Sequence, residues 1–169
     1  MRFLIIFIFF LSSASASEVP NIKNIVINKE LKTYNNLTFS DSRGKNVKLE
    51  DLKGKLVLLN FWATWCAPCK EEMPSLDSLQ INPDLKNIEI IPINVGKDSL
   101  KKANKFFDDL KINNLSIYFD TPVTLAKQLS LRGIPTTILF NKEGKEFARI
   151  IGSINFSDAK FIEWLSAYN

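Results

Sequence analysis

The stretch Leu56–Cys69 reads LVLLNFWATWCAPC and decides the fold. Its first six residues are apolar apart from Asn60, so both faces of a strand must be covered, as is typical of a central parallel strand. After Cys66 the pattern becomes helical, with apolar residues at threefold spacing across Met73–Leu79. Pro74 lies inside this predicted helix and is expected to kink it. The stretch therefore predicts a buried strand that leads into a helix, with two cysteines at the junction.

These cysteines, Cys66 and Cys69, are the only two in 169 residues, and the chain has no histidine. A purely structural disulfide is one interpretation, but so small a loop constrains little of the unfolded chain. Half of a zinc site is another, but structural zinc normally needs four ligands, usually Cys or His. We therefore expect no metal and no cofactor, and a Cys66–Cys69 disulfide that opens and closes in redox chemistry.

The two thiols are predicted to have different roles. Cys66 should lie at the helix N-terminus, where backbone N–H groups favour the thiolate, so it is the predicted attacking thiol. Cys69 lies one turn further into the helix, should be less exposed, and would resolve the mixed disulfide. Ala67 and Pro68 between them are small and stiff, which helps to hold both sulfurs within reach.

Strand and helix patterns alternate along the rest of the chain. Turn residues predict hairpins over 37–49 and 136–151. We also expect strands at 88–95 and 117–119, and helices from Asp98 or Ser99, from Thr121-Pro122 to Leu129, and after a Ser157 cap. The buried faces of the first and last of these helices are predicted to be Leu100, Ala103, Phe106, Phe107 and Leu110, and Phe161, Ile162, Leu165 and Tyr168. Pro92 should leave the 88–95 strand unpaired or bulged on one side. This order predicts an α/β sandwich with a mixed sheet.

The N-terminus has the features of an export signal. A positive start, an apolar run over 3–11 and small residues over 12–16 predict a secretory signal peptide cut after Ala16, with an uncleaved membrane anchor as the alternative. Residues 17–35 form a predicted extension, either an edge strand or a tether, and 36–169 one domain. The net charge of +4 is spread among acidic residues, which gives no support for nucleic-acid binding.

The segment Phe61–Pro74, FWATWCAPCKEEMP, resembles the active-site segment of the TlpA/ResA-like branch of the thioredoxin superfamily. A second segment, Arg132–Thr137, resembles the cis-proline loop of the same fold. The resemblance implies a thioredoxin-like fold, with a central mixed sheet flanked by helices and an N-terminal β-hairpin. It also implies a cis peptide before Pro135, which would face the disulfide, and an Ile134 backbone open to a bound partner strand. With Trp65 and Pro68, these two residues are the predicted substrate-binding residues.

Glu72 matches an acidic residue that ResA-like proteins place near the active-site cysteines. A carboxylate at that place can relay the proton that Cys69 must lose. The alternative is a solvated helix glutamate like Glu71. Thioredoxins proper usually carry a buried aspartate where this chain has Asn60, and an amide cannot exchange protons, so Glu72 is expected to take on more of that duty.

Together these features predict an exported, monomeric thiol–disulfide oxidoreductase of the periplasm. The resemblance implies a reductant, kept reduced by a membrane electron donor. Its clients would be apocytochrome c or copper-site assembly proteins. Two alternatives are a non-catalytic copper carrier of the Sco type, which uses a wider cysteine spacing and a histidine, and a peroxiredoxin-type peroxidase, which places proline and threonine differently before its cysteine.

Overall fold

A computed structural model describes residues 22–120 and 124–169. It contains one eight-stranded sheet with the strand order β1-β8-β7-β4-β5-β6-β2-β3. The strands are β1 (Ile25–Lys32), β2 (Thr38–Asp41), β3 (Asn46–Lys48), β4 (Leu56–Trp62), β5 (Ile88–Asn94), β6 (Tyr118–Phe119), β7 (Thr136–Phe140) and β8 (Glu146–Ile151). The helices are η1 (Leu49–Leu52), α1 (Ala67–Gln80), α2 (Leu100–Leu110), α3 (Leu125–Gln128) and α4 (Ala159–Ser166). The predicted thioredoxin-like α/β fold is thereby confirmed.

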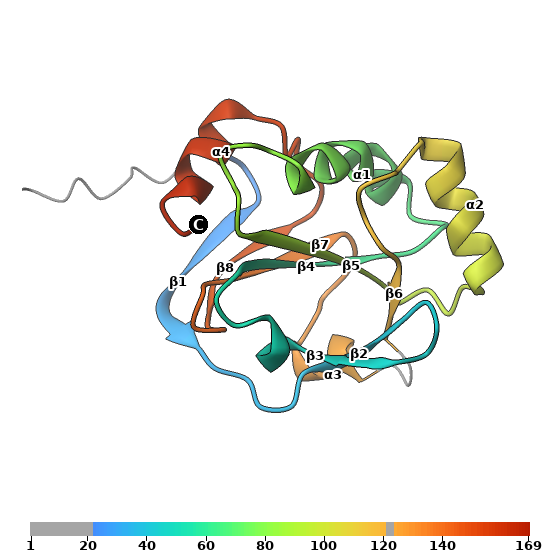
Figure 1. Ribbon diagram of the computed structural model, residues 1–169, viewed down its shortest axis with the longest axis horizontal. Helices are drawn as coiled ribbons and strands as arrows, with labels where there is room; N and C mark the ends of the chain where they lie inside the picture. The colour runs from blue at the N-terminus through green and yellow to red at the C-terminus, as the bar shows by residue number, and fades with distance from the viewer. Residues whose placement is uncertain (1–21, 121–123) are drawn as a thin grey trace, which may run out of the picture.

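Strand β4 is the centre of the sheet, as its apolar sequence predicted. It pairs in parallel with β5 on one side and antiparallel with β7 on the other. All of its residues are buried, because helices cover both faces of the sheet. Figure 1 shows α1 and α4 on one face and α3 on the other. The carboxyl ends of β4 and β5 therefore lie side by side at one edge of the sheet, where the cysteine loop begins.

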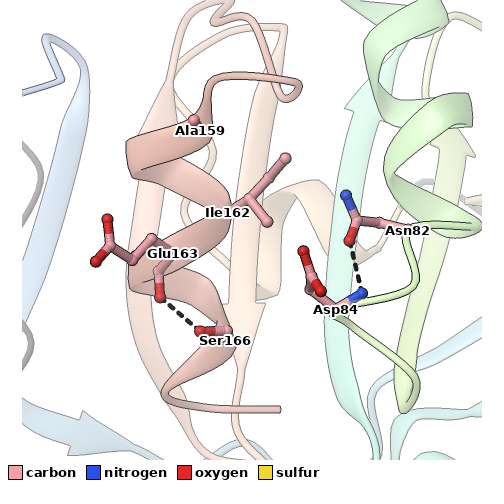
Figure 2. Close-up of a pocket in the computed structure, with 6 residues that line it drawn as sticks. All are labelled: Asn82, Asp84, Ala159, Ile162, Glu163 and Ser166. Atoms are coloured by element: carbon pink, nitrogen blue, oxygen red, sulfur yellow. Dashed lines mark hydrogen bonds between the residues drawn. The ribbon is translucent and has the colours of Figure 1, made fainter.

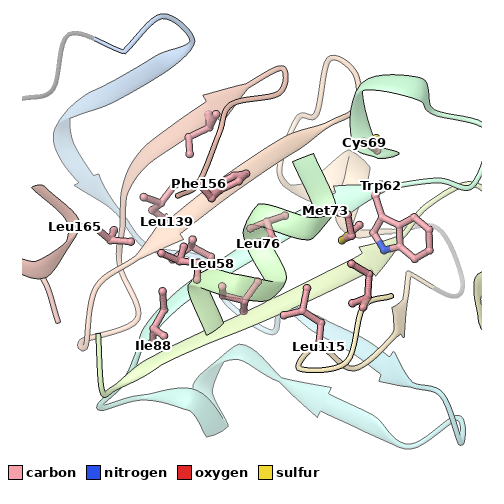
Figure 3. Close-up of a cluster of buried hydrophobic side chains, with 14 of the residues drawn as sticks. Leu58, Trp62, Cys69, Met73, Leu76, Ile88, Leu115, Leu139, Phe156 and Leu165 are labelled. Atoms are coloured by element: carbon pink, nitrogen blue, oxygen red, sulfur yellow. The ribbon is translucent and has the colours of Figure 1, made fainter. Parts of the chain in front are cut away.

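Two apolar layers follow from the alternation of side chains along β4. Leu58 and Trp62 point into the larger layer, which α1, α2 and α4 cover and which Figure 3 shows. Leu59 and Phe61 point into the smaller layer beneath α3 and η1. The first turn of α1 belongs to the larger layer, because Cys69 packs there with no exposed surface.

The segment predicted as an extension contributes an edge strand. Strand β1 pairs antiparallel with β8, and Ile25 lies opposite Ile150. The edge-strand interpretation of this region is therefore confirmed and the tether interpretation is wrong for residues 25–32. The predicted signal peptide, residues 1–16, lies outside the described residues.

Several local predictions need correction. Asp158, not Ser157, caps α4, because its carboxylate accepts hydrogen bonds from two N–H groups of the first turn. Leu100 at the start of α2 is 39% exposed rather than buried. Trp164, which the pattern of α4 left out, is buried instead. Part of the predicted helix at 121–129 lies outside the described residues, and its described portion begins at Leu125.

Other local predictions are confirmed. Both hairpins form, and Ser99 caps α2. Pro92 pairs with β4 alone, because β6 reaches only Ile93 and Asn94. The missing N–H of this proline therefore interrupts no ladder on the β6 side.

Candidate active site

The two cysteines lie at the junction between β4 and α1. Cys66 is the N-cap of α1, and the Cys69 N–H points at its sulfur with an N–Sγ distance of 3.3 Å. The two sulfurs form a disulfide, with their Cα atoms 5.3 Å apart. Cys66 keeps 5% of its surface exposed and Cys69 none. The helix N-terminus is thus directed at the outer sulfur, which favours negative charge on Cys66.

The second predicted segment lies at the same edge of the sheet. The Ile134–Pro135 peptide bond is cis. Because Thr136 pairs with Phe61, Pro135 lies at the carboxyl end of β4, where the cysteine loop begins. Pro135 is buried and its carbonyl accepts a hydrogen bond from the Gly152 N–H, whereas Ile134 is partly exposed. The fold therefore brings the two motif segments together at one rim.

Glu72 is buried on α1, nearly one turn after Cys69, with only 2% of its surface exposed. Its Oε1 accepts a hydrogen bond of 2.8 Å from Nδ2 of Asn60, and that same amide donates to Oγ1 of Thr137 at 2.9 Å. Glu71 beside it is exposed, so the solvated-helix interpretation does not apply to Glu72. The sequence predicted no role for Thr137 at the site. Only the pairing of β4 with β7, which places Thr137 opposite Asn60, could have indicated this contact.

The carboxyl of Glu72 has little to compensate for its burial. Among the described residues, Oε2 of Glu72 and Oδ1 of Asn60 have no hydrogen-bond partner. Burial raises the pKa of Glu72 to about 8, against the opposing influence of the Asn60 amide and the Ile154 N–H. The group can therefore hold a proton at neutral pH and still release it near the pH range in which a thiol ionises.

A surface pocket of about 330 Å³ lies beside Glu72. It is lined by Glu71, Glu72, Ser75, Ser153, Ile154 and Asn155. A buried acid that borders a pocket open to solvent has a route for proton exchange that does not pass through the apolar core.

The remaining predicted contact residues lie on the outside of the rim. Trp65 is 69% exposed, as expected of a contact residue, whereas Trp62 is fully buried. Pro68 is exposed in the first turn of α1. Sequence reasoning treated Asp98 only as a helix cap, but its carboxylate instead accepts hydrogen bonds from Thr64 in the cysteine loop.

Another surface pocket, of about 530 Å³, lies away from this rim. Figure 2 shows it between α4 and the loop after α1, at the opposite end of α1 from the cysteines. It contains none of the predicted site residues. Within residues 22–120 and 124–169 there is no group of three or more His, Cys, Asp or Glu side chains placed to hold a metal ion. No helix in the same part of the chain is long and apolar enough to cross a bilayer.

The chain is similar to several proteins named for thiol–disulfide chemistry. The chain is 35% identical over 122 residues to the thiol–disulfide oxidoreductase ResA of Bacillus subtilis (strain 168), which covers 72% of this chain and 67% of that protein. A DsbF homologue from Corynebacterium diphtheriae is 26% identical, with a TM-score of 0.69 and coverage of 86% and 95%. A secreted thiol–disulfide isomerase from Corynebacterium glutamicum shares the fold, with a TM-score of 0.72 at 22% identity over 89% and 96% of the two chains.

The protein is a thiol–disulfide oxidoreductase with the thioredoxin fold. Its fold, the disulfide between Cys66 at the helix cap and Cys69, and the cis peptide before Pro135 together define this class. The model of the AhpC/TSA family matches residues 24–145, and the chain belongs to that family. Its resemblance to the ResA-like branch is confirmed by the curated relatives. The ResA matches extend over about two thirds of the length of those relatives.

Proposed function

We propose that this protein is an exported reductant that acts on disulfides of other proteins. The observation that carries the proposal is the placement of Glu72. It is a buried carboxyl one turn from Cys69, and only one hydrogen bond from another side chain supports its charged form. The named ResA relatives are thiol–disulfide oxidoreductases, which supports the class of reaction.

The proposed reaction runs in two exchanges. In the reduced protein, the Cys66 thiolate attacks one sulfur of a client disulfide and forms a mixed disulfide, and the other client sulfur leaves as a thiolate that takes a proton from solvent. Glu72, once it has released its own proton to solvent, accepts the Cys69 proton, and the resulting Cys69 thiolate attacks the Cys66 sulfur. That step closes the Cys66–Cys69 disulfide and releases the second client sulfur as a thiolate, which takes up a proton, so two electrons pass from this protein to the client.

The contact residues have distinct proposed roles in this reaction. We propose that Trp65 and Pro68 contact the client beside the attacked sulfur, because both are exposed next to Cys66. The backbone of Ile134, before the buried Pro135, would pair with the extended client segment. The protein would act as a monomer, without cofactor, metal or nucleic acid.

The resemblance to the ResA-like branch supports the proposed clients and setting. The clients would be apocytochrome c or copper-site assembly proteins in the periplasm. A membrane electron donor would reopen the Cys66–Cys69 disulfide after each cycle. Either a cleaved signal or an uncleaved anchor in the first 16 residues would deliver the protein there.

The decisive experiment is reduction of insulin by the purified domain, with Cys66→Ser as the matched variant. We expect the variant to lose the activity, and Cys69→Ser to retain the first exchange and accumulate the mixed disulfide. Undiminished insulin reduction by Cys66→Ser would refute the proposal. Equilibration against a glutathione series gives the direction of electron flow, because a potential near about −270 mV marks a reductant and one near about −120 mV an oxidant.

The two alternative functions have their own tests. Stoichiometric copper(I) binding at the reduced thiols, without disulfide reductase activity, would indicate a copper carrier. Consumption of hydrogen peroxide that depends on Cys66 would indicate a peroxidase. We expect neither result. The chain has no histidine, which copper carriers of the Sco type use, and Thr64 lies only two residues before Cys66, which differs from the peroxidase pattern.

A further inference from the structure

The loop of residues 94–98, which starts at the last residue of β5, is hydrogen-bonded to the loop that carries Trp65 and Cys66. Asp98 accepts two hydrogen bonds from Thr64, one from its N–H to Oδ2 at 2.9 Å and one from its hydroxyl to Oδ1 at 2.8 Å. One carboxylate therefore fixes both the backbone and the side chain of the residue two positions before Cys66.

Asn94 braces that carboxylate. Its Nδ2 donates to Oδ2 of Asp98 at 2.9 Å, and its Oδ1 accepts from the Gly96 N–H at 3.0 Å. Asn94 is only 2% exposed, and the next residue, Val95, donates its N–H to the carbonyl of Trp62 at 3.0 Å. Part-buried hydrogen bonds at both ends make the 94–98 loop a rigid support rather than a loose connection.

Gly96 is the point at which this support meets the tryptophan. A Cβ atom at Gly96 would lie 2.6 Å from Cβ of Ala63, 2.9 Å from Oδ2 of Asp98 and 3.0 Å from Nε1 of Trp65. No residue with a side chain fits there without displacing the cysteine loop. One edge of the Trp65 ring thus rests on Gly96, while 69% of the residue faces solvent.

We propose that the 94–98 loop determines how tightly a protein client docks, because it holds Trp65 as a fixed contact surface beside Cys66. Exposed tryptophan is the residue type most often found at the energetic centre of protein interfaces. Holding the ring in place before binding removes the entropy cost of ordering it in the complex. The partner is the client chain that flanks the target disulfide, so the proposal rests on the proposed function. Asp98 is a positioning residue that acts through Thr64.

Two substitutions at Asp98 separate geometry from charge. Asp98→Ala removes the acceptors for Thr64 and Asn94. Asp98→Asn can keep the whole arrangement, since its Oδ1 can accept from the Thr64 N–H and the Asn94 amide while its NH₂ donates to the Thr64 hydroxyl. Gly96→Ala is an independent variant that displaces Trp65 and leaves the carboxylate intact.

The experiment compares rate constants of the reduced protein with insulin, a protein disulfide, and with oxidised glutathione, a small-molecule disulfide. We expect Asp98→Ala and Gly96→Ala to slow the insulin reaction about tenfold and the glutathione reaction less than twofold. Asp98→Asn should stay within twofold of the unaltered protein for both. The indole N–H signals in an NMR spectrum, assigned with Trp65→Phe, should show a shift mainly of the Trp65 signal in the Ala variants.

Three outcomes would overturn the inference. Asp98→Ala could slow both disulfides equally, it could slow neither, or Asp98→Asn could be as defective with insulin as Asp98→Ala. Unaltered protein that reduced neither disulfide would instead refute the proposed activity, so the two failures are distinguishable.

Discussion

Two buried glutamates, Glu72 and Glu146, differ in almost everything except burial. Glu146 on β8 has no exposed surface, and its carboxylate pairs with Arg149 at 2.7 and 2.8 Å. It also accepts hydrogen bonds from Tyr34 at 2.6 Å and Asn28 at 2.8 Å. Glu72 is equally hidden but has one amide donor and no ion pair among the described residues.

The two environments shift the pKa values in opposite directions. Burial raises the pKa of both carboxyls, but the hydrogen bonds from Arg149, Asn28 and Tyr34 overcome this effect at Glu146 and hold its pKa below the usual value. At Glu72 burial prevails, and the pKa rises to about 8. A carboxylate with a full set of donors is thus a structural element, whereas one with few donors is free to exchange its proton.

The largest expected effect comes from breaking the supported pair. Glu146→Gln leaves the Arg149 guanidinium, which is 15% exposed, without its counter-charge. We expect the free energy of unfolding to fall by about 3–5 kcal/mol. Urea denaturation at pH 7 measures this fall, and Glu72→Gln under the same conditions is the matched control, for which no loss is expected. Equal losses in the two variants would show that the two glutamates do not differ in their contribution to stability.

The next effect is on turnover. Glu72→Gln keeps a group of the same shape but removes the proton acceptor for Cys69, so we expect the resolving exchange to slow by about 10²-fold. Stopped-flow measurement of the decay of the mixed disulfide against pH tests this. The variant should also show a changed pH dependence of cysteine alkylation. Unaltered pH profiles would reduce Glu72 to a packing residue.

The pH dependence of stability should have opposite signs at the two sites. For Glu72 the folded pKa of about 8 exceeds the unfolded value of 4.5, so its unfavourable effect develops as pH rises from about 4.5 to 8. The slope is up to about 1.4 kcal/mol per pH unit, and Glu72→Gln should remove it. Glu146 stabilises the fold above its unfolded pKa, and this contribution is lost as pH falls through its lowered folded value.

Denaturant unfolding between pH 4 and 9 measures both contributions. The comparison fails if Glu72→Gln does not become the more stable protein toward pH 8.

The smallest effect sharpens the role of the neighbours. Tyr34→Phe removes the hydrogen bond that the hydroxyl donates to Glu146 and the one that it accepts from Arg149, but it leaves the ion pair between Glu146 and Arg149 in place, so we expect a loss of about 1–2 kcal/mol. Insulin reduction by the folded variant should be unchanged. A loss as large as that of Glu146→Gln would mean that the hydroxyl, and not the ion pair, stabilises the cluster.

More of the site around Cys66 and Cys69 than of the Glu146 cluster could be predicted from the sequence, for physical reasons. The cysteines, the helix start and Glu72 lie within seven residues, so their relation is fixed by local helix geometry. The Glu146 cluster joins β8 to Tyr34 and Asn28, more than a hundred residues earlier, and forms only when β1 pairs with β8. The predicted cap of α4 was wrong for another reason. Ser157 and Asp158 are adjacent, and both residue types are equally suited to an N-cap.

The antiparallel pairing of β1 with β8 also determines where the polypeptide enters the domain. Ile25 lies opposite Ile150, and the Asn24 amide donates to the Ser153 carbonyl, one residue from the glycine that bonds to Pro135. The chain upstream therefore joins the domain on the same rim as the reactive sulfurs.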